Sequence, residues 1–150
     1  MISQEYANEL LKHICGVSDS SMPQSLYLGL CTDEPSSVNG TVTGEPSPTN
    51  SPSYSRKIVG GSLSSSKSYF GNASNGIIKN TEEIQFNVCR EVGGWGKMNY
   101  FFLSKTADGA AIMWGTIKDK TGNTGVTITY ETVPVFYKEA LQASIDVPLS

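Results

Sequence analysis

Apolar and polar positions alternate over much of the chain after residue 24, and this period of two is typical of half-buried β-strands. The alternating runs cover residues 24–31, 54–61, 83–88, 126–130, 133–137 and 141–147. Residues 72–80 are instead rich in turn residues, with Asn75-Gly76 as a hairpin tip. With two apolar runs further on, the pattern predicts an all-β fold of about eight strands, either an antiparallel β-sandwich or a jelly-roll-like barrel.

The two apolar runs, at 98–103 and 110–117, flank a link that carries Asp108-Gly109, a pair favoured in tight β-turns. They predict a β-hairpin. In the first run both faces of the strand are mostly apolar, so we expect this strand at the centre of a sheet. Its two faces would then be covered by another layer or by a neighbouring subunit.

The N-terminal residues 2–15 follow a different period, with Ile2, Tyr6, Leu10 and Ile14 recurring every four residues. This spacing predicts one amphipathic helix, capped by Ser3 and ended by Gly16. The helix must dock on its own sheet or on a partner, and we expect Leu10 and Ile14 to face the core. Residues 32–55 form a long irregular loop with four prolines. Such a loop is either functional or mobile, or a solvated insertion at a sheet edge.

The length of 150 residues predicts a single domain, a β-sandwich with the helix at about 2–15 and the loop at about 32–55. A net charge of −3 and a pI near 5.1 argue against nucleic acid or an anionic membrane as a partner. We find no signal peptide and no apolar run of ~20 residues. The three cysteines lack a CxxC pattern and indicate reduced thiols, as in a protein made in a cytoplasm.

Reactive side chains are sparse and scattered. His13 is the only histidine, and Cys15, two residues away, would not face it on a helix. The sequence has no paired Cys/His spacing for zinc, no run of acidic residues for calcium and no phosphate-binding loop. We therefore expect no catalytic residues, no metal and no cofactor.

Aromatic residues allow a second interpretation, because exposed rings stack on sugars. The candidates are Tyr54, Tyr69, Phe70, Trp95, Tyr100 and Trp114. We favour a core position for Trp95 and Trp114, since large aromatic side chains are highly buried on average. A carbohydrate-binding module remains an alternative.

Several short motifs occur in a fixed order along the chain. They are the helix segment 7–13, Leu26-Tyr27-Leu28-Gly29-Leu30, Gly44-Glu45-Pro46-Ser47, Tyr54-Ser55-Arg56, Ile84-Gln85-Phe86, Gly94-Trp95-Gly96 and Ala111-Ile112-Met113-Trp114-Gly115. In this order they resemble a family of small virion proteins of tailed bacteriophages, often labelled phage tail fibre proteins. Two departures are the Pro- and Ser-rich stretch 50–53 and the aromatic strand after Trp95.

The resemblance implies a non-enzymatic structural protein of the virion, made in the bacterial host cytoplasm. We expect a capsid decoration or cement protein that binds the major capsid protein or other virion proteins. A tail fibre, baseplate accessory or receptor-binding protein is the alternative. We further expect a homo-oligomer, with a trimer favoured. The candidate interface residues are Tyr6, Leu10, Ile14, Tyr54, Arg56, Trp95, Tyr100 and Phe102.

Overall fold

The computed structural model describes residues 1–17, 23–61 and 68–144 and contains one helix followed by antiparallel strands. The helix is α1 (Gln4–Ile14). The strands are β1 (Leu26–Cys31), β2 (Lys57–Gly60), β3 (Ile77–Lys79), β4 (Ile84–Gln85), β5 (Gly96–Met98), β6 (Tyr100–Ser104), β7 (Ala111–Thr116), β8 (Val126–Ile128), β9 (Val135–Phe136) and β10 (Gln142–Ser144).

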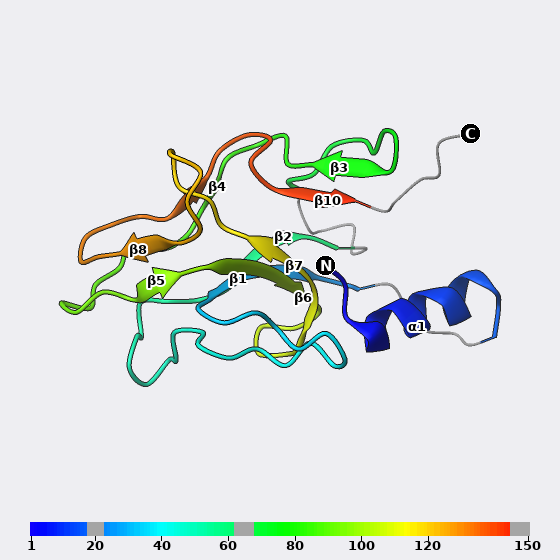
Figure 1. Cartoon of the computed structure of the whole chain (residues 1–150), viewed down its shortest axis with the longest axis horizontal. Coiled ribbons are helices and arrows are strands. Elements are labelled where there is room, and N and C mark those ends of the chain that lie inside the picture. The colour runs from blue at the N-terminus through cyan, green and yellow to red at the C-terminus, as the bar shows by residue number, and fades with distance from the viewer. Residues whose placement is uncertain (18–22, 62–67, 145–150) are drawn as a thin grey trace.

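A four-stranded antiparallel sheet with the order β2-β1-β6-β7 forms the centre of the molecule. Three two-stranded pairs, β10–β3, β4–β9 and β5–β8, complete the strands of the described residues. Figure 1 shows the β3–β10 pair above the central sheet and the cyan loop after β1 below it. The predicted all-β fold with one N-terminal helix is therefore confirmed in a sandwich-like form. The described residues form no closed barrel.

The predicted hairpin is confirmed as β6–β7, in which Phe102 pairs with Trp114. As predicted, β6 is central, with β1 on one side and β7 on the other. Its side chains enter two clusters, Leu103 in the larger core and Phe102 in a smaller cluster beneath the sheet. Both faces of β6 are thus covered by this chain itself, and β6 offers no free face to a neighbouring subunit.

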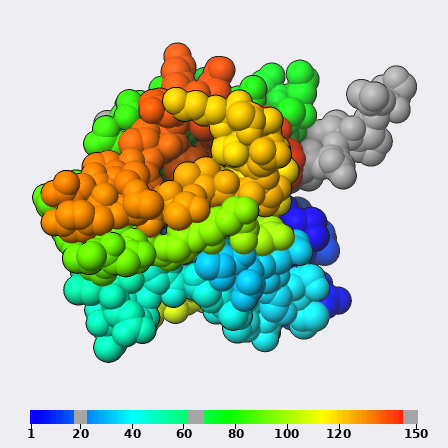
Figure 2. All heavy atoms as spheres, turned by 60° about the vertical axis from the view of Figure 1, so that its left-hand side comes forward, coloured from blue at the N-terminus to red at the C-terminus, as the bar shows by residue number. Residues whose placement is uncertain are grey.

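The loop between β1 and β2 is the layer that covers the Phe102 face. It has no regular structure, as predicted, but Pro35, Gly40, Pro46 and Ser51 are buried. Figure 2 shows the cyan loop lying against the light-green β5 region, on the side opposite to the orange β8 region. The loop is therefore a structural layer and not a solvated insertion at a sheet edge.

Residues 1–3 close the outer edge of β7. The Ser3 amide donates to the Ile112 carbonyl at 3.0 Å, and the Trp114 amide donates to the Met1 carbonyl at 2.9 Å. The Ser3 hydroxyl then accepts the Tyr6 amide at 3.2 Å, which confirms the predicted N-cap of α1. Gly16 follows α1 with a φ of 70°, as expected for a helix stop.

Ten strands, and not about eight, occur in the described residues. β5 is additional because residues 96–98 form a strand of their own before β6. The other additional strand is β3, which lies in the stretch predicted to contain only turns. Its residues pair with β10, more than 60 residues later, so no local pattern marks it. The predicted final strand, 141–147, is seen as Gln142–Ser144, and 145–147 lie outside the described residues, as does most of the serine-rich stretch 62–68.

Candidate interaction surface

Four of the eight candidate interface residues are buried inside the chain. Tyr54, Trp95 and Phe102 are only 6%, 7% and 0% exposed, and the Arg56 side chain is 4% exposed. In the single chain these side chains do not reach the surface and hold the fold together, and their contact with a partner stays a prediction. The preferred core position of Trp95 and Trp114 is confirmed.

Arg56 instead forms a buried ion pair that fixes the loop before β2 to the central sheet. Its Nε and Nη2 donate to the two carboxylate oxygens of Glu45, each at 2.8 Å, in the two-pronged geometry that suits a guanidinium. Its Nη1 donates to the Ser104 hydroxyl at 2.7 Å and to the Gly109 carbonyl at 2.8 Å. The guanidinium also lies 4.7 Å from the centre of the Phe102 ring. One side chain therefore joins the loop, the end of β6 and the β6–β7 turn.

Tyr54 extends this contact to β1. Its hydroxyl donates to Glu45 Oε1 at 2.8 Å and accepts the Leu30 amide at 3.0 Å. Burial, and next the Glu45 charge, raises the pKa of this hydroxyl well above its usual range. The phenol therefore stays protonated and remains a donor to Glu45. We call Glu45, Tyr54, Arg56 and Ser104 the Arg56 network.

A second polar contact holds Trp95. Its indole Nε1 donates to Glu91 Oε2 at 2.7 Å, and both the Ser53 amide and hydroxyl also donate to the Glu91 carboxylate. The Ser53 hydroxyl is the main cause that lowers the Glu91 pKa to about 2. Burial acts in the opposite direction, and the Ser53 amide and the Trp95 indole lower the pKa further. The Trp95 ring meets Tyr54 edge-on at 5.2 Å. The two polar contacts are therefore connected through these rings.

The motifs that carry the family resemblance meet in these contacts. Glu45 comes from 44–47, Tyr54 and Arg56 from 54–56, and Leu30 from 26–30. Glu91 and Ser104 lie outside these motifs and were not predicted, because no periodicity or spacing marks them. Ser104 binds Arg56, and Glu91 binds Ser53 and Trp95, so both residues connect distant segments of the chain.

The other candidates lie near α1 or at the end of the sheet. Tyr100 is partly buried and packs against the small cluster under the sheet. Tyr6 and Leu10 are partly buried, and Ile14 is 69% exposed. The expectation that Ile14 faces the core is wrong, because α1 extends beyond the sheet (Figure 1).

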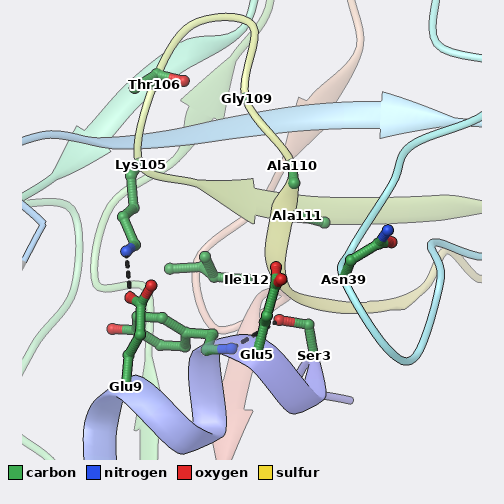
Figure 3. A pocket seen from close by; sticks show the side chains of 11 residues that line it. Ser3, Glu5, Glu9, Asn39, Lys105, Thr106, Gly109, Ala110, Ala111 and Ile112 are labelled. Carbon is green, nitrogen blue, oxygen red and sulfur yellow. Dashed lines mark hydrogen bonds and ion pairs between the residues drawn. The ribbon is translucent and has the colours of Figure 1, made fainter.

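A shallow hollow of about 230 Å³ lies between α1 and the β6–β7 turn. Figure 3 shows Glu5 and Glu9 pointing from α1 into it, with Lys105 reaching down from the turn. The Lys105 ammonium pairs with Glu9 Oε2 at 2.5 Å and lies 5.3 Å from the Tyr6 ring centre. A second hollow of about 340 Å³ is lined by residues of 71–81 and Glu139.

Within residues 1–17, 23–61 and 68–144, no group of three His, Cys, Asp or Glu side chains could hold a metal ion. No helix in those same ranges has the length and apolar content that crossing a membrane requires. The exposed aliphatic residues of α1 are a different kind of feature. Leu11, Ile14 and the following Val17 are 59%, 69% and 74% exposed. We call Leu10, Leu11, Ile14 and Val17 the α1 stripe, and it is the candidate interaction surface.

Comparison with known protein families gives a match over most of the chain. A family model described as podophage GP4 fiber I protein gp80 matches residues 1–135. No curated protein sequence matches the chain. The match includes α1, the central sheet and both polar contacts described above.

Proposed function

We propose that this chain, which belongs to the family of podophage GP4 fiber I protein gp80, is a non-enzymatic component of the fibre apparatus on the tail of a phage particle. The family match over residues 1–135 carries this proposal. The family is one of phage fibre-type structural proteins, which indicates a location in the virion. We propose that the protein is made in the bacterial host cytoplasm and joins the particle there.

The distribution of polar groups supports a structural role. Arg56, Glu45 and Glu91 each make several side-chain contacts, and all three bind other parts of the same chain. His13 lies exposed on α1, away from these groups. Contacts of this kind within one chain make the fold more rigid. A protein of a particle that persists outside the cell requires such rigidity.

The α1 stripe supports attachment as the way in which the protein works. Exposed aliphatic residues that lie together on one element mark contact sites in soluble proteins. The proposed partners are copies of this chain and other virion proteins. No role in binding nucleic acid or membrane is proposed, since the net charge is −3.

Capsid decoration is the second candidate. One observation favours it: the described residues fold into short paired strands and contain no long repeated shaft. A decoration protein would use the same rigidity to bind the major capsid protein at many equivalent positions.

Antibody labelling of intact particles by electron microscopy distinguishes the two candidates. We expect gold particles at the tail, with heads unlabelled. Particles assembled without the protein should lose tail-associated density while their heads keep their resistance to heat. Label on heads, with loss of head stability in its absence, would favour decoration. Absence from purified particles would contradict both.

A further inference from the structure

The sequence contains two Asn-Gly pairs, Asn39-Gly40 and Asn75-Gly76, and the fold places them in different surroundings. An asparagine before glycine loses its side-chain amide most easily, because glycine has no Cβ to hinder attack of its backbone nitrogen on the amide carbon. Both asparagines are exposed, so exposure alone does not decide which of them reacts. The hydrogen bonds that hold each pair do differ.

The first pair, Asn39-Gly40, is held at both reacting groups. The Gly40 amide donates to the Ser36 carbonyl at 2.8 Å, and the Gly40 carbonyl accepts the Ala111 amide at 2.7 Å. The Asn39 Oδ1 atom accepts the Thr41 amide at 3.1 Å and the Thr41 hydroxyl at 2.8 Å. The attacking nitrogen and the amide that it would attack are therefore both engaged.

The second pair, Asn75-Gly76, forms the tip of a two-residue hairpin. The Ser74 amide donates to the Ile77 carbonyl at 2.8 Å, and the Ile77 amide donates back to the Ser74 carbonyl at 2.9 Å. Asn75 and Gly76 have φ values of 52° and 74°, as in a type I′ turn. Within residues 1–17, 23–61 and 68–144, neither the Asn75 side chain nor the Gly76 amide has a hydrogen-bond partner. The two reacting groups are therefore free, while the residues on either side of them are fixed.

The turn also suits the ring through which deamidation passes. The Gly76 nitrogen meets Asn75 Cγ in a five-membered ring when ψ of Asn75 is about −120°, the value at the first central position of a type II′ turn. Asn75 already has the positive φ of that position. Types I′ and II′ both close two-residue hairpins and differ by a rotation of the central peptide, which glycine tolerates. The hairpin thus reaches the reactive geometry with the hydrogen bonds between Ser74 and Ile77 intact.

We propose that Asn75 is a site of spontaneous deamidation in the folded protein, and that Asn39 is protected from it. The Gly76 amide nitrogen loses its proton to water or hydroxide and attacks Asn75 Cγ. The bond from Cγ to Nδ2 breaks, Nδ2 takes up a proton and leaves as ammonia, and a succinimide ring remains. Water then opens the ring at either carbonyl and gives aspartate or isoaspartate. Water is the co-reactant, and no oxidation or reduction takes place.

The product alters the hairpin that leads into β3. Each event replaces a neutral amide by a carboxylate, which is ionised at neutral pH. The new charge enters the second hollow, which Asn75 lines together with Glu139. Isoaspartate also adds one carbon to the main chain inside the turn, so the two hydrogen bonds between Ser74 and Ile77 lose their register. We expect β3 to pair less firmly with β10 in the modified chain.

Peptide mapping by mass spectrometry tests the proposal after the purified full chain has been incubated at mildly alkaline pH. We expect the small mass gain from exchange of an amino group for a hydroxyl at Asn75. The same gain at Asn39 should be at least about tenfold slower, because three hydrogen bonds must break there first. In urea the two asparagines should react at similar rates, since unfolding removes the difference between them.

Two further readouts identify the route. Incubation in heavy-oxygen water should place the label at Asn75, and an isoaspartyl methyltransferase should methylate part of the product. Asn75→Gln is the matched variant, because glutamine would have to close a larger ring, and it should show neither signal. Urea unfolding followed by tryptophan fluorescence shows whether this variant keeps the fold.

Equal rates at Asn39 and Asn75 in the folded chain would overturn the proposal. An Asn75 that stays intact in the folded chain but reacts in urea would overturn it as well, as would a product that persists in Asn75→Gln. The proposal does not rest on the proposed function. Labelling of particles tests that function separately, and either result can fail without the other.

Discussion

The loop between β1 and β2 and the helix α1 show opposite relations between regularity and burial. The loop has no strand or helix from residue 32 to 56, yet Tyr54 is 6% exposed and the Arg56 side chain 4%. The helix is the most regular element of the described residues, and none of its residues is buried. Its apolar period is also the clearest in the sequence.

This difference separates two kinds of information. The spacing of apolar residues determines local conformation, because hydrogen bonds within a helix need no distant partner. Burial requires a matching surface and partners for every polar group. The loop finds both on the central sheet, through Glu45, Tyr54 and Arg56. The second half of α1 has no such matching surface among the described residues of its own chain.

The largest expected effect is at Arg56. Arg56→Ala leaves the Glu45 carboxylate without its main partner, and we expect the free energy of unfolding to fall by about 3–5 kcal/mol. The lower end applies, because the Glu45 side chain keeps 20% exposure. Urea unfolding followed by tryptophan fluorescence measures the loss. Arg90→Ala, at an exposed arginine, is the control and should change stability by less than about 0.5 kcal/mol.

A double-mutant cycle sharpens this prediction. Glu45→Ala combined with Arg56→Ala should cost less than the sum of the two single changes, because either change alone breaks the same pair. Additive losses would show that the ion pair does not fix the loop.

The next effect is at Gly40, where the loop approaches β7. A Cβ at Gly40 would lie 1.8 Å from the Ala111 carbonyl oxygen, and φ is +73°. Gly40→Ala should therefore lower the free energy of unfolding by about 1–3 kcal/mol. Gly93→Ala, where nothing lies within 4 Å, should be nearly neutral in the same urea titration. If both variants lose the same stability, the loop is not packed against β7 as described.

A smaller, pH-dependent effect is expected at Glu91. Its pKa is lowered to about 2, first by the Ser53 hydroxyl, so the ionised form is favoured in the folded state. The contribution of Glu91 is therefore present above the unfolded-state pKa of ~4.3 and lost as the pH falls toward 2.

Unfolding midpoints of wild type and Glu91→Gln test this. We expect the gap between them to be widest at pH 7 and to shrink steadily between pH 5 and pH 2. When Ser53→Ala is added to both proteins, the gap between their midpoints at pH 7 should be smaller, since this change removes the main donor to Glu91. A gap that does not change with pH would contradict this role of the carboxylate.

The smallest effect is expected at the ion pair that joins α1 to the β6–β7 turn. The Lys105 and Glu9 side chains are 36% and 48% exposed, so water screens their attraction. Lys105→Met should cost about 0.2–1 kcal/mol at low salt and less at 1 M salt. A loss comparable to that of Arg56→Ala would mean that the two regions are anchored by equally strong contacts.

Local features of the fold could be predicted from the sequence. The cap at Ser3, the strand that became β1 and the β6–β7 hairpin each depend on residues close together in the chain. The two-sided apolar pattern of 98–103 also indicated correctly that β6 is central. Burial of Trp95 and Trp114 followed from residue type alone.

The long-range features could not be predicted. Glu91 binds Ser53 and Trp95, and Ser104 binds Arg56, but a single acidic residue or serine has no period that marks such partners. β3 consists of three residues between turns, and its partner β10 lies far along the chain. The orientation of α1 could not be derived either, because the pattern identifies an apolar face without saying what covers it.

The three residues before α1 have a consequence for crowded assemblies. Because Met1 to Ser3 occupy the outer backbone groups of β7 at Ile112 and Trp114, and the Tyr69 amide donates to the Val59 carbonyl of β2 at 2.9 Å, neither border of the central sheet is fully open. Open borders let strands of neighbouring molecules add to one another and form aggregates. Neither edge of the central sheet is therefore a good site for adding a strand from a neighbouring molecule.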